Sequence, residues 1–82
     1  MEEIGKVKHF FPHIPAAIVD LSADLKVGDE IIVKSKTGEE KFRQVVESIQ
    51  VDRKPIQSGK SGDEVAIQVI GKAKEGDIVC SE

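Results

Sequence analysis

The sequence predicts a small all-β domain, and three observations support this fold class. A glycine–aspartate pair followed by an apolar alternation occurs three times, in residues 25–34, 61–69 and 75–79. Glycine adopts positive φ readily and aspartate tolerates or caps a tight turn, so each pair predicts a turn that leads into a strand. Hydrophobic residues make up 39% of the chain, with three Phe and no Trp or Tyr, so the core must be mainly aliphatic.

The residues after each glycine–aspartate pair alternate with the period of a strand that is buried on one face. In the second copy, Glu64 and Gln68 point away from the apolar residues. The residues that this alternation places in the core are Ile31, Val33, Val65, Ile67 and Val69.

Two strands are expected before the first of these units. Residues 5–9 form one, with Val7 inward and Lys6 and Lys8 outward, because residues two apart share a face of a strand. Residues 16–21 form the next, and its inward side chains are Ala17, Val19 and Leu21. Two prolines in residues 10–15 exclude a regular central strand there and predict a shaped loop or a sheet edge.

Residues 42–49 fit two kinds of structure. Their apolar side chains recur with the spacing of an amphipathic helix, which the local pattern slightly favours. A strand requires a bulge near Glu47 and Ser48, so that Val46 and Ile49 face the same way.

Length and composition narrow the class of protein. A chain of 82 residues is expected to form a single domain, residues 1–82. A net charge of −3 disfavours general electrostatic binding of nucleic acid, although a local basic strip can still form. A single cysteine, no membrane-length apolar stretch and no signal peptide predict a cytoplasmic protein with no disulfide and no membrane partner.

The ordered set of strands and turns resembles the second domain of translational GTPases, the β-barrel shared by elongation factor Tu and initiation factor two. The matching segments are residues 5–7, 17–21, 25–33, 46–49, 62–69 and 76–79. Stand-alone elongation-factor-like proteins of this size are similar. The resemblance implies a closed or nearly closed antiparallel Greek-key barrel of six or seven strands, in which residues 46–49 are a strand and not a helix.

The same resemblance implies a non-catalytic binding module that contacts tRNA, ribosomal RNA or a protein translation factor. The alternative is a protein-interaction barrel unrelated to translation, because similar barrels occur as accessory domains at the ends of larger enzymes, including collagenase-like peptidases.

No nucleotide or other cofactor is expected. The segment Gly59-Lys60-Ser61 contains the end of a phosphate-binding loop, but Lys54 stands where that motif requires its first glycine. The segment also does not lead into a helix. We therefore expect no nucleotide binding, because the phosphate-binding motif requires both that first glycine and a helix that follows it.

Catalytic and metal-binding residues are not expected either, and we predict that the chain is not an enzyme. His9, His13 and Cys80 are too few and too scattered for a metal site, which needs three or four convergent ligands. None of them has a recognisable base or orienting carboxylate. Surface histidines and an inert thiol are the simpler interpretation.

Two sets of residues are candidates for binding. A basic strip could run along Lys6, Lys8 and His9 and across Arg43 or Arg53, although the same residues could simply solvate a barrel exterior. The apolar residues Phe10, Phe11 and Ile14 either plug one end of a barrel or form a small docking surface. Ile18 and Ile32 lie out of phase with their strands and could extend such a surface.

Overall fold

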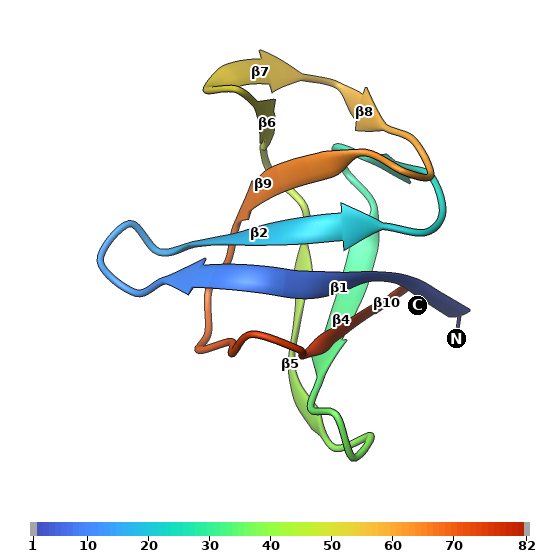
Figure 1. Cartoon of the computed structure of the whole chain (residues 1–82), viewed down its shortest axis with the longest axis vertical. Coiled ribbons are helices and arrows are strands. Elements are labelled where there is room, and N and C mark those ends of the chain that lie inside the picture. Colours follow the sequence, from blue (N-terminus) through green and yellow to red (C-terminus); the bar gives the residue numbers. More distant parts are fainter. Residues whose placement is uncertain (1, 82) are drawn as a thin grey trace.

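The computed structural model describes residues 2–81, and these residues form ten β-strands and no helix (Figure 1). The strands are β1 (Glu2–Phe11), β2 (Ala16–Leu21), β3 (Leu25–Lys26), β4 (Glu30–Lys34), β5 (Glu40–Val45), β6 (Ile49–Val51), β7 (Lys54–Ile56), β8 (Ser58–Gly59), β9 (Glu64–Gln68) and β10 (Ile78–Ser81). Every pairing between them is antiparallel. The predicted all-β antiparallel class is therefore confirmed.

The predicted closed barrel of six or seven strands is wrong. Eight strands form one sheet in the order β5-β4-β10-β1-β2-β9-β6-β7, and β3 pairs with β8 in a separate ribbon. The sheet begins at β5 and ends at β7, and these two edges do not pair with each other. Pro55 in β7 is compatible with this position, because proline has no N–H to donate to a further strand.

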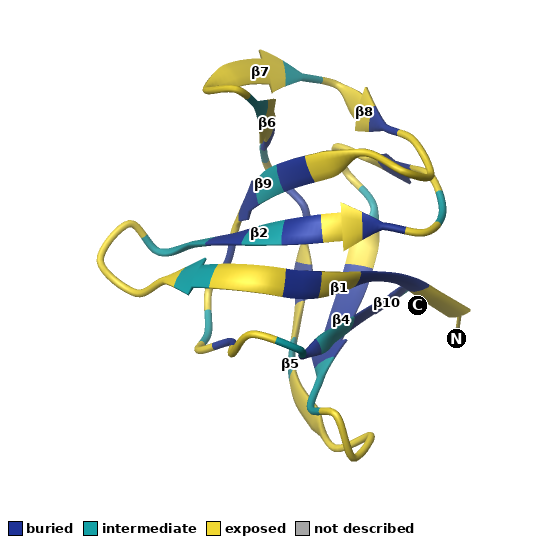
Figure 2. Cartoon of the chain, viewed as in Figure 1, coloured by how far each residue is buried: buried dark blue, intermediate teal, exposed yellow. Residues whose placement is uncertain are grey.

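The sheet curls around one aliphatic core (Figure 2). Buried and exposed residues alternate along β2 and β9, so one face of each strand supplies the core and the other faces outward. The residues predicted to be inward are all buried: Val7, Ala17, Val19, Leu21, Ile31, Val33, Ile49, Val65, Ile67 and Val69.

The expectation that Ile32 extends an exposed docking surface is wrong. Its side chain is fully buried on the outer face of the sheet. In the register of β4, Ile32 lies between Cys80 of β10 and Arg43 of β5, so a neighbouring strand flanks it on both sides. Cys80 is buried at the same place.

The three glycine–aspartate turns share one geometry. In each, the aspartate carboxylate accepts a hydrogen bond from the backbone N–H of a lysine three residues earlier, and the aspartate N–H donates to that lysine's carbonyl. The glycine between them has a φ of 97°, 94° or 92°, as at the third position of a type II turn. The turns are Lys26–Asp29, Lys60–Asp63 and Lys74–Asp77.

Each turn also clamps one buried residue of another segment. The glycine N–H donates to the carbonyl of that residue at 2.7–2.8 Å, and the residue's own N–H donates to the aspartate carbonyl at 2.8 Å. The glycine and the aspartate of the turn together lie opposite a single residue of the other segment. This is the arrangement of a β-bulge whose first residue is glycine. The clamped residues are Val46 for Gly28–Asp29, Leu21 for Gly62–Asp63 and Val7 for Gly76–Asp77.

The clamp on Val46 explains the ambiguous pattern of residues 42–49. β5 ends at Val45, residues 46–48 are not a strand, and β6 begins at Ile49. Val46 and Ile49 are both buried. They are three residues apart and would face opposite sides of one regular strand, but the chain leaves β5 and enters β6 between them. The strand expected for residues 46–49 is wrong for residues 46–48 and right only for Ile49, the first residue of β6. The helix that the local pattern favoured for residues 42–49 is not formed.

One side chain joins β5 to the end of β9 where no backbone pairing occurs. The buried Gln44 donates from Nε2 to the carbonyl of Gln68 at 2.7 Å, and its Oε1 accepts from the N–H of Ile70 at 2.8 Å. The amide therefore replaces the two hydrogen bonds that a neighbouring backbone would make.

Replacing Gly62 with alanine tests the turn geometry. A Cβ at this position would meet no atom within 4 Å, so only the positive φ opposes it. We expect Gly62→Ala to lower the free energy of unfolding by ~1–2 kcal/mol, measured by urea denaturation. Stabilisation, which alanine produces at glycines of ordinary φ, would contradict the assigned conformation.

Replacing Gln44 with leucine tests the side-chain bridge. Gln44→Leu removes the partner of the Gln68 carbonyl and of the Ile70 N–H and should lower the free energy of unfolding by ~1 kcal/mol. The control is Gln68→Leu, because the Gln68 side chain is exposed and only its carbonyl takes part. Equal effects of the two variants would show that the bridge does not matter.

Candidate protein-interaction groove

The outward face of β2, β9 and β6 carries small and apolar side chains. Ala16 and Ile18 must face outward because their neighbours in β2 fill the core. The register places Ile18 beside Ala66 of β9, and Ala66 beside Gln50 of β6. The two alanines leave a hollow of about 500 Å³ between larger side chains, and these strands form its floor.

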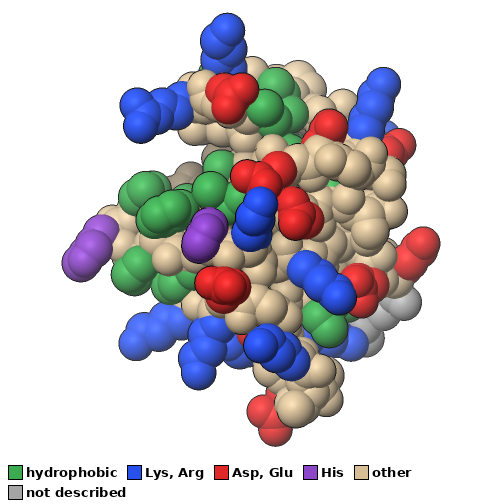
Figure 3. Space-filling model, in the orientation of Figure 1, with side chains coloured by type: hydrophobic (Ala, Val, Ile, Leu, Met, Phe, Trp, Pro, Cys, Tyr) green, Lys and Arg blue, Asp and Glu red, His purple; other side chains and the backbone are tan. Residues whose placement is uncertain are grey.

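Two loops form the walls of this hollow. One wall consists of Phe11, the last residue of β1, and Ile14 in the connection between β1 and β2, which are 42% and 67% exposed. The connection contains a cis Ile14–Pro15 bond. The β6–β7 hairpin contributes Asp52 and Arg53 on the opposite side. Figure 3 shows hydrophobic side chains gathered beside the β1–β2 connection, on the left of the molecule.

A second hollow of about 240 Å³ continues the first toward Ser48 and Gln68. The residues common to both are Ile14, Ala16, Gln50 and Ala66. We call the two together the interaction groove. It follows the outward positions of β9 from Glu64 to Gln68.

The charged end of the groove holds one ion pair. Lys8 Nζ lies 2.8 Å from Glu64 Oε2. This hydrogen bond, together with the attraction of Glu64 and Asp20, raises the pKa of Lys8 above its ordinary value. Lys8 is therefore matched by acidic neighbours, and the basic strip expected along β1 is interrupted.

The other residues of the expected basic strip do not come together. Lys6 is exposed on β1, but β10 and β4 separate it from Arg43 on β5. Arg43 donates two hydrogen bonds to Glu40, at 3.0 and 3.1 Å. These hydrogen bonds are the main reason that the pKa of Glu40 is lower than its ordinary value. Arg53 alone of these residues lines the groove.

The aromatic candidates have separate roles. Phe10 is partly buried and packs against the core, as the plug hypothesis predicts. Phe11 is 42% exposed and lies on the groove wall. His9 is exposed, with its ring 6.3 Å from that of Phe11 and its Nδ1 4.0 Å from Glu75.

Sequence reasoning missed the residues that shape the groove. Ala16, Ala66 and Gln50 gave no signal as separate residues, because small or polar outward residues are common on strands. The signal that could have found them is the alignment of two outward alanines in neighbouring strands, and it requires knowing that β2 pairs with β9.

Neither a histidine nor a cysteine lines the groove. Cys80 is buried on a different face, and His13 is exposed. Within residues 2–81 no group of three or more His, Cys, Asp or Glu side chains could hold a metal ion. In that same part of the chain, no helix has the length and apolar character needed to span a membrane.

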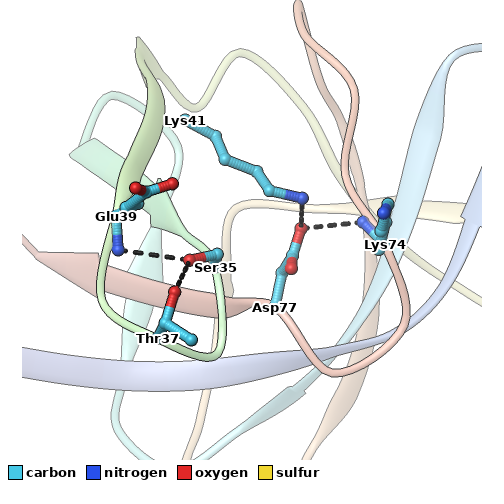
Figure 4. A network of polar contacts seen from close by, with 6 residues as sticks. All are labelled: Ser35, Thr37, Glu39, Lys41, Lys74 and Asp77. Carbon is cyan, nitrogen blue, oxygen red and sulfur yellow. Dashed lines mark hydrogen bonds and ion pairs between the residues drawn. The ribbon is translucent and has the colours of Figure 1, made fainter.

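A second polar cluster lies beside the third turn (Figure 4). Asp77 Oδ2 accepts from Lys41 Nζ at 2.7 Å and from the N–H of Lys74 at 2.8 Å. The Asp77 side chain is only 4% exposed, and that of Lys41 is 25% exposed. The adjoining cavity of about 340 Å³ also contains Ser35 and Thr37, whose hydroxyls lie 2.9 Å apart. Because Asp77 joins a turn to β5, we assign this cluster a role in the fold.

Comparison with known proteins finds one similar curated protein and a similar solved domain. No protein-family model matches it. It is 35% identical over 77 residues to an uncharacterized protease of Methanocaldococcus jannaschii, which covers 94% of this chain and 19% of the relative. The chain thus spans about a fifth of that relative's length.

The solved structures show the fold. The C-terminal domain of a Geobacillus thermoleovorans protein assigned to the U32 peptidases has a TM-score of 0.89 and 22% identity, covering 99% of this chain and 92% of that domain. Its selenomethionine variant has a TM-score of 0.87, covering 96% and 98%. The fold of this chain is that of a peptidase C-terminal domain.

The expected relationship to the second domain of translational GTPases is therefore wrong, and so is the expected role in contacting tRNA, ribosomal RNA or a translation factor. The resemblance depended on repeated glycine–aspartate units. In the structure these units are turns closed by local hydrogen bonds, and a shared scaffold does not fix function.

Comparing two aspartates separates the ion pair from the turn. Asp29→Ala loses only the turn hydrogen bond and should lower the free energy of unfolding by ~1 kcal/mol. Asp77→Ala loses that bond and also leaves Lys41 without its partner, so we expect ~3 kcal/mol, measured by urea denaturation. Equal losses would show that the Lys41–Asp77 pair adds nothing to stability.

Proposed function

We propose that this chain is a non-catalytic accessory module of a peptidase-type protein, and that it holds a polypeptide segment in the interaction groove. The carrying observation is the groove itself, bounded by the exposed Phe11 and Ile14, on a fold that matches a peptidase C-terminal domain. The likeness to a protease that is about five times longer supports an accessory role, with the reaction carried out elsewhere.

Binding fits the described side chains better than cleavage. Peptide hydrolysis needs an activated nucleophile or a metal-bound water next to a group that stabilises the developing negative charge. The side chains around the groove are mainly alkyl groups, with one aromatic ring, two amides, Arg53 and the carboxylates of Asp52 and Glu64. Glu64 is held in an ion pair by Lys8. Such a surface can bury apolar side chains and orient a chain, which is what a holding module requires.

The dimensions of the groove suit a polypeptide segment. Its main hollow of about 500 Å³ is within the range typical of ligand pockets. Fully burying an exposed Phe or Ile side chain gains ~1.5–3 kcal/mol, so covering the exposed part of Phe11 or Ile14 gains roughly half of that free energy. Two such residues on one wall supply enough free energy for a weak and reversible interaction.

A binding assay with an unfolded polypeptide tests this function. Reduced, carboxymethylated α-lactalbumin labelled with a fluorophore should bind the chain, as measured by fluorescence anisotropy, and should stay intact. Phe11→Ser and Ile14→Ser should each weaken binding by about tenfold, because each removes an apolar contact. Their melting temperatures should change little, because both side chains are exposed.

The matched control is Ile70→Ser. Ile70 is 74% exposed, similar to Ile14, but lies outside the groove. Binding should be unchanged in this variant. Failure of the wild-type chain to bind, an equal loss in Ile70→Ser, or cleavage of the polypeptide by the chain would each contradict the proposed function.

A further inference from the structure

The backbone at the tip of the β6–β7 hairpin is unfavourable for the residues that occupy it. Val51 pairs with Lys54, so Asp52 and Arg53 form the two-residue loop. Their φ angles are 51° and 67°. A two-residue loop with both φ angles positive is a type I′ arrangement, which favours Asn or Asp followed by Gly. Asp52 fits this preference, whereas Arg53 stands where glycine is favoured.

The side chain of Arg53 offers a reason for its presence. Arg53 lines the groove, and among residues 2–81 no ion pair satisfies its guanidinium. Strained residues that persist at a binding surface commonly contribute to function. Two acidic residues line the same hollow as Arg53. Glu64 is paired with Lys8, and Asp52 is the neighbour of Arg53 in the turn.

The shape of the groove selects an extended segment. Its floor follows Glu64, Ala66 and Gln68, which are two residues apart on β9. An extended peptide also presents every second side chain to one side, about 6.8 Å apart. A segment that lies between the two walls can therefore direct one side chain toward Ile14 on one wall and the side chain two residues further along toward Arg53 on the other.

We infer that the groove binds an extended polypeptide segment by two linked contacts, and this inference rests on the proposed function. An apolar side chain of the segment fills the hollow beside Phe11 and Ile14. A carboxylate two residues further along the segment pairs with the guanidinium of Arg53. The planar guanidinium can donate two parallel hydrogen bonds to a carboxylate, which accounts for arginine at this position.

The test uses three blocked pentapeptides. The first is serine–leucine–serine–glutamate–serine, the second carries glutamine in place of glutamate, and the third carries serine in place of leucine. Amide shifts of the chain, followed by NMR during titration, give the affinity and the location of binding. We expect the first peptide to bind in the groove with a Kd of about 1 mM or tighter, and the other two to bind about tenfold more weakly.

Two substitutions in the turn separate function from stability. Arg53→Gly should raise the melting temperature, because glycine suits this φ, and should reduce the affinity for the glutamate peptide to that for the glutamine peptide. Asp52→Asn should strengthen binding of the glutamate peptide, because it removes a carboxylate beside Arg53 while keeping a residue suited to the turn. Lys54→Ala is the control, because Lys54 is exposed but does not line the groove.

Several results would overturn the inference and leave the proposed function standing. Equal binding of the glutamate and glutamine peptides would remove the role of Arg53. Unchanged selectivity in Arg53→Gly would do the same. Absence of peptide binding, when unfolded lactalbumin still binds, would exclude this recognition pattern. Self-association of the chain that Phe11→Ser abolishes would identify a second copy as the occupant of the groove.

Discussion

The fold depends on a hydrogen-bonded clamp that is used three times. In each clamp a glycine with positive φ turns the chain, an aspartate carboxylate closes the turn, and the two residues hold a buried residue of another segment by hydrogen bonds. The clamped residues Val7, Leu21 and Val46 all belong to the core. Turn chemistry and core packing are therefore coupled at three points, and this coupling holds a strongly curved sheet in one register.

The curvature of the sheet produces the interaction groove. Inward-facing residues of β2 and β9 fill the aliphatic core, so their outward neighbours Ala16, Ile18 and Ala66 form a shallow floor. The β1–β2 connection and the β6–β7 hairpin rise on either side of that floor. β6 ends its pairing with β9 after two residues and continues into the hairpin, which brings Arg53 over the groove. The binding surface is thus the outer face of the same strands that build the core.

The sequence allowed most of the core to be predicted but not the way in which the sheet ends. Period-two patterns placed Val19, Ile31 and Ile67 correctly, because burial on one face determines where apolar residues can stand. The bridge made by Gln44 could not be predicted, because a lone glutamine on a strand has the pattern of a surface residue. Its burial follows from a tertiary contact with Gln68 and Ile70.

The candidate site was predicted only in part for the same reason. Phe11 and Ile14 stood out because they are apolar residues beside prolines, and both line the groove. Lys6 and Lys8 stood out by charge alone, but charge in sequence does not reveal that Glu64 lies beside Lys8 across the sheet. The family was misassigned because the glycine–aspartate spacing reflects local turn geometry, which unrelated small β domains can share.

The central claim is that this domain holds polypeptide in one groove on the outer face of β2, β9 and β6. Amide hydrogen exchange of the full chain, measured with and without saturating unfolded polypeptide, tests it most directly. The account predicts slower exchange concentrated in the β1–β2 connection and the β6–β7 hairpin, with β4 and β5 unchanged. Slower exchange centred on the outer face around Arg43, or no local change when polypeptide is bound, would contradict it.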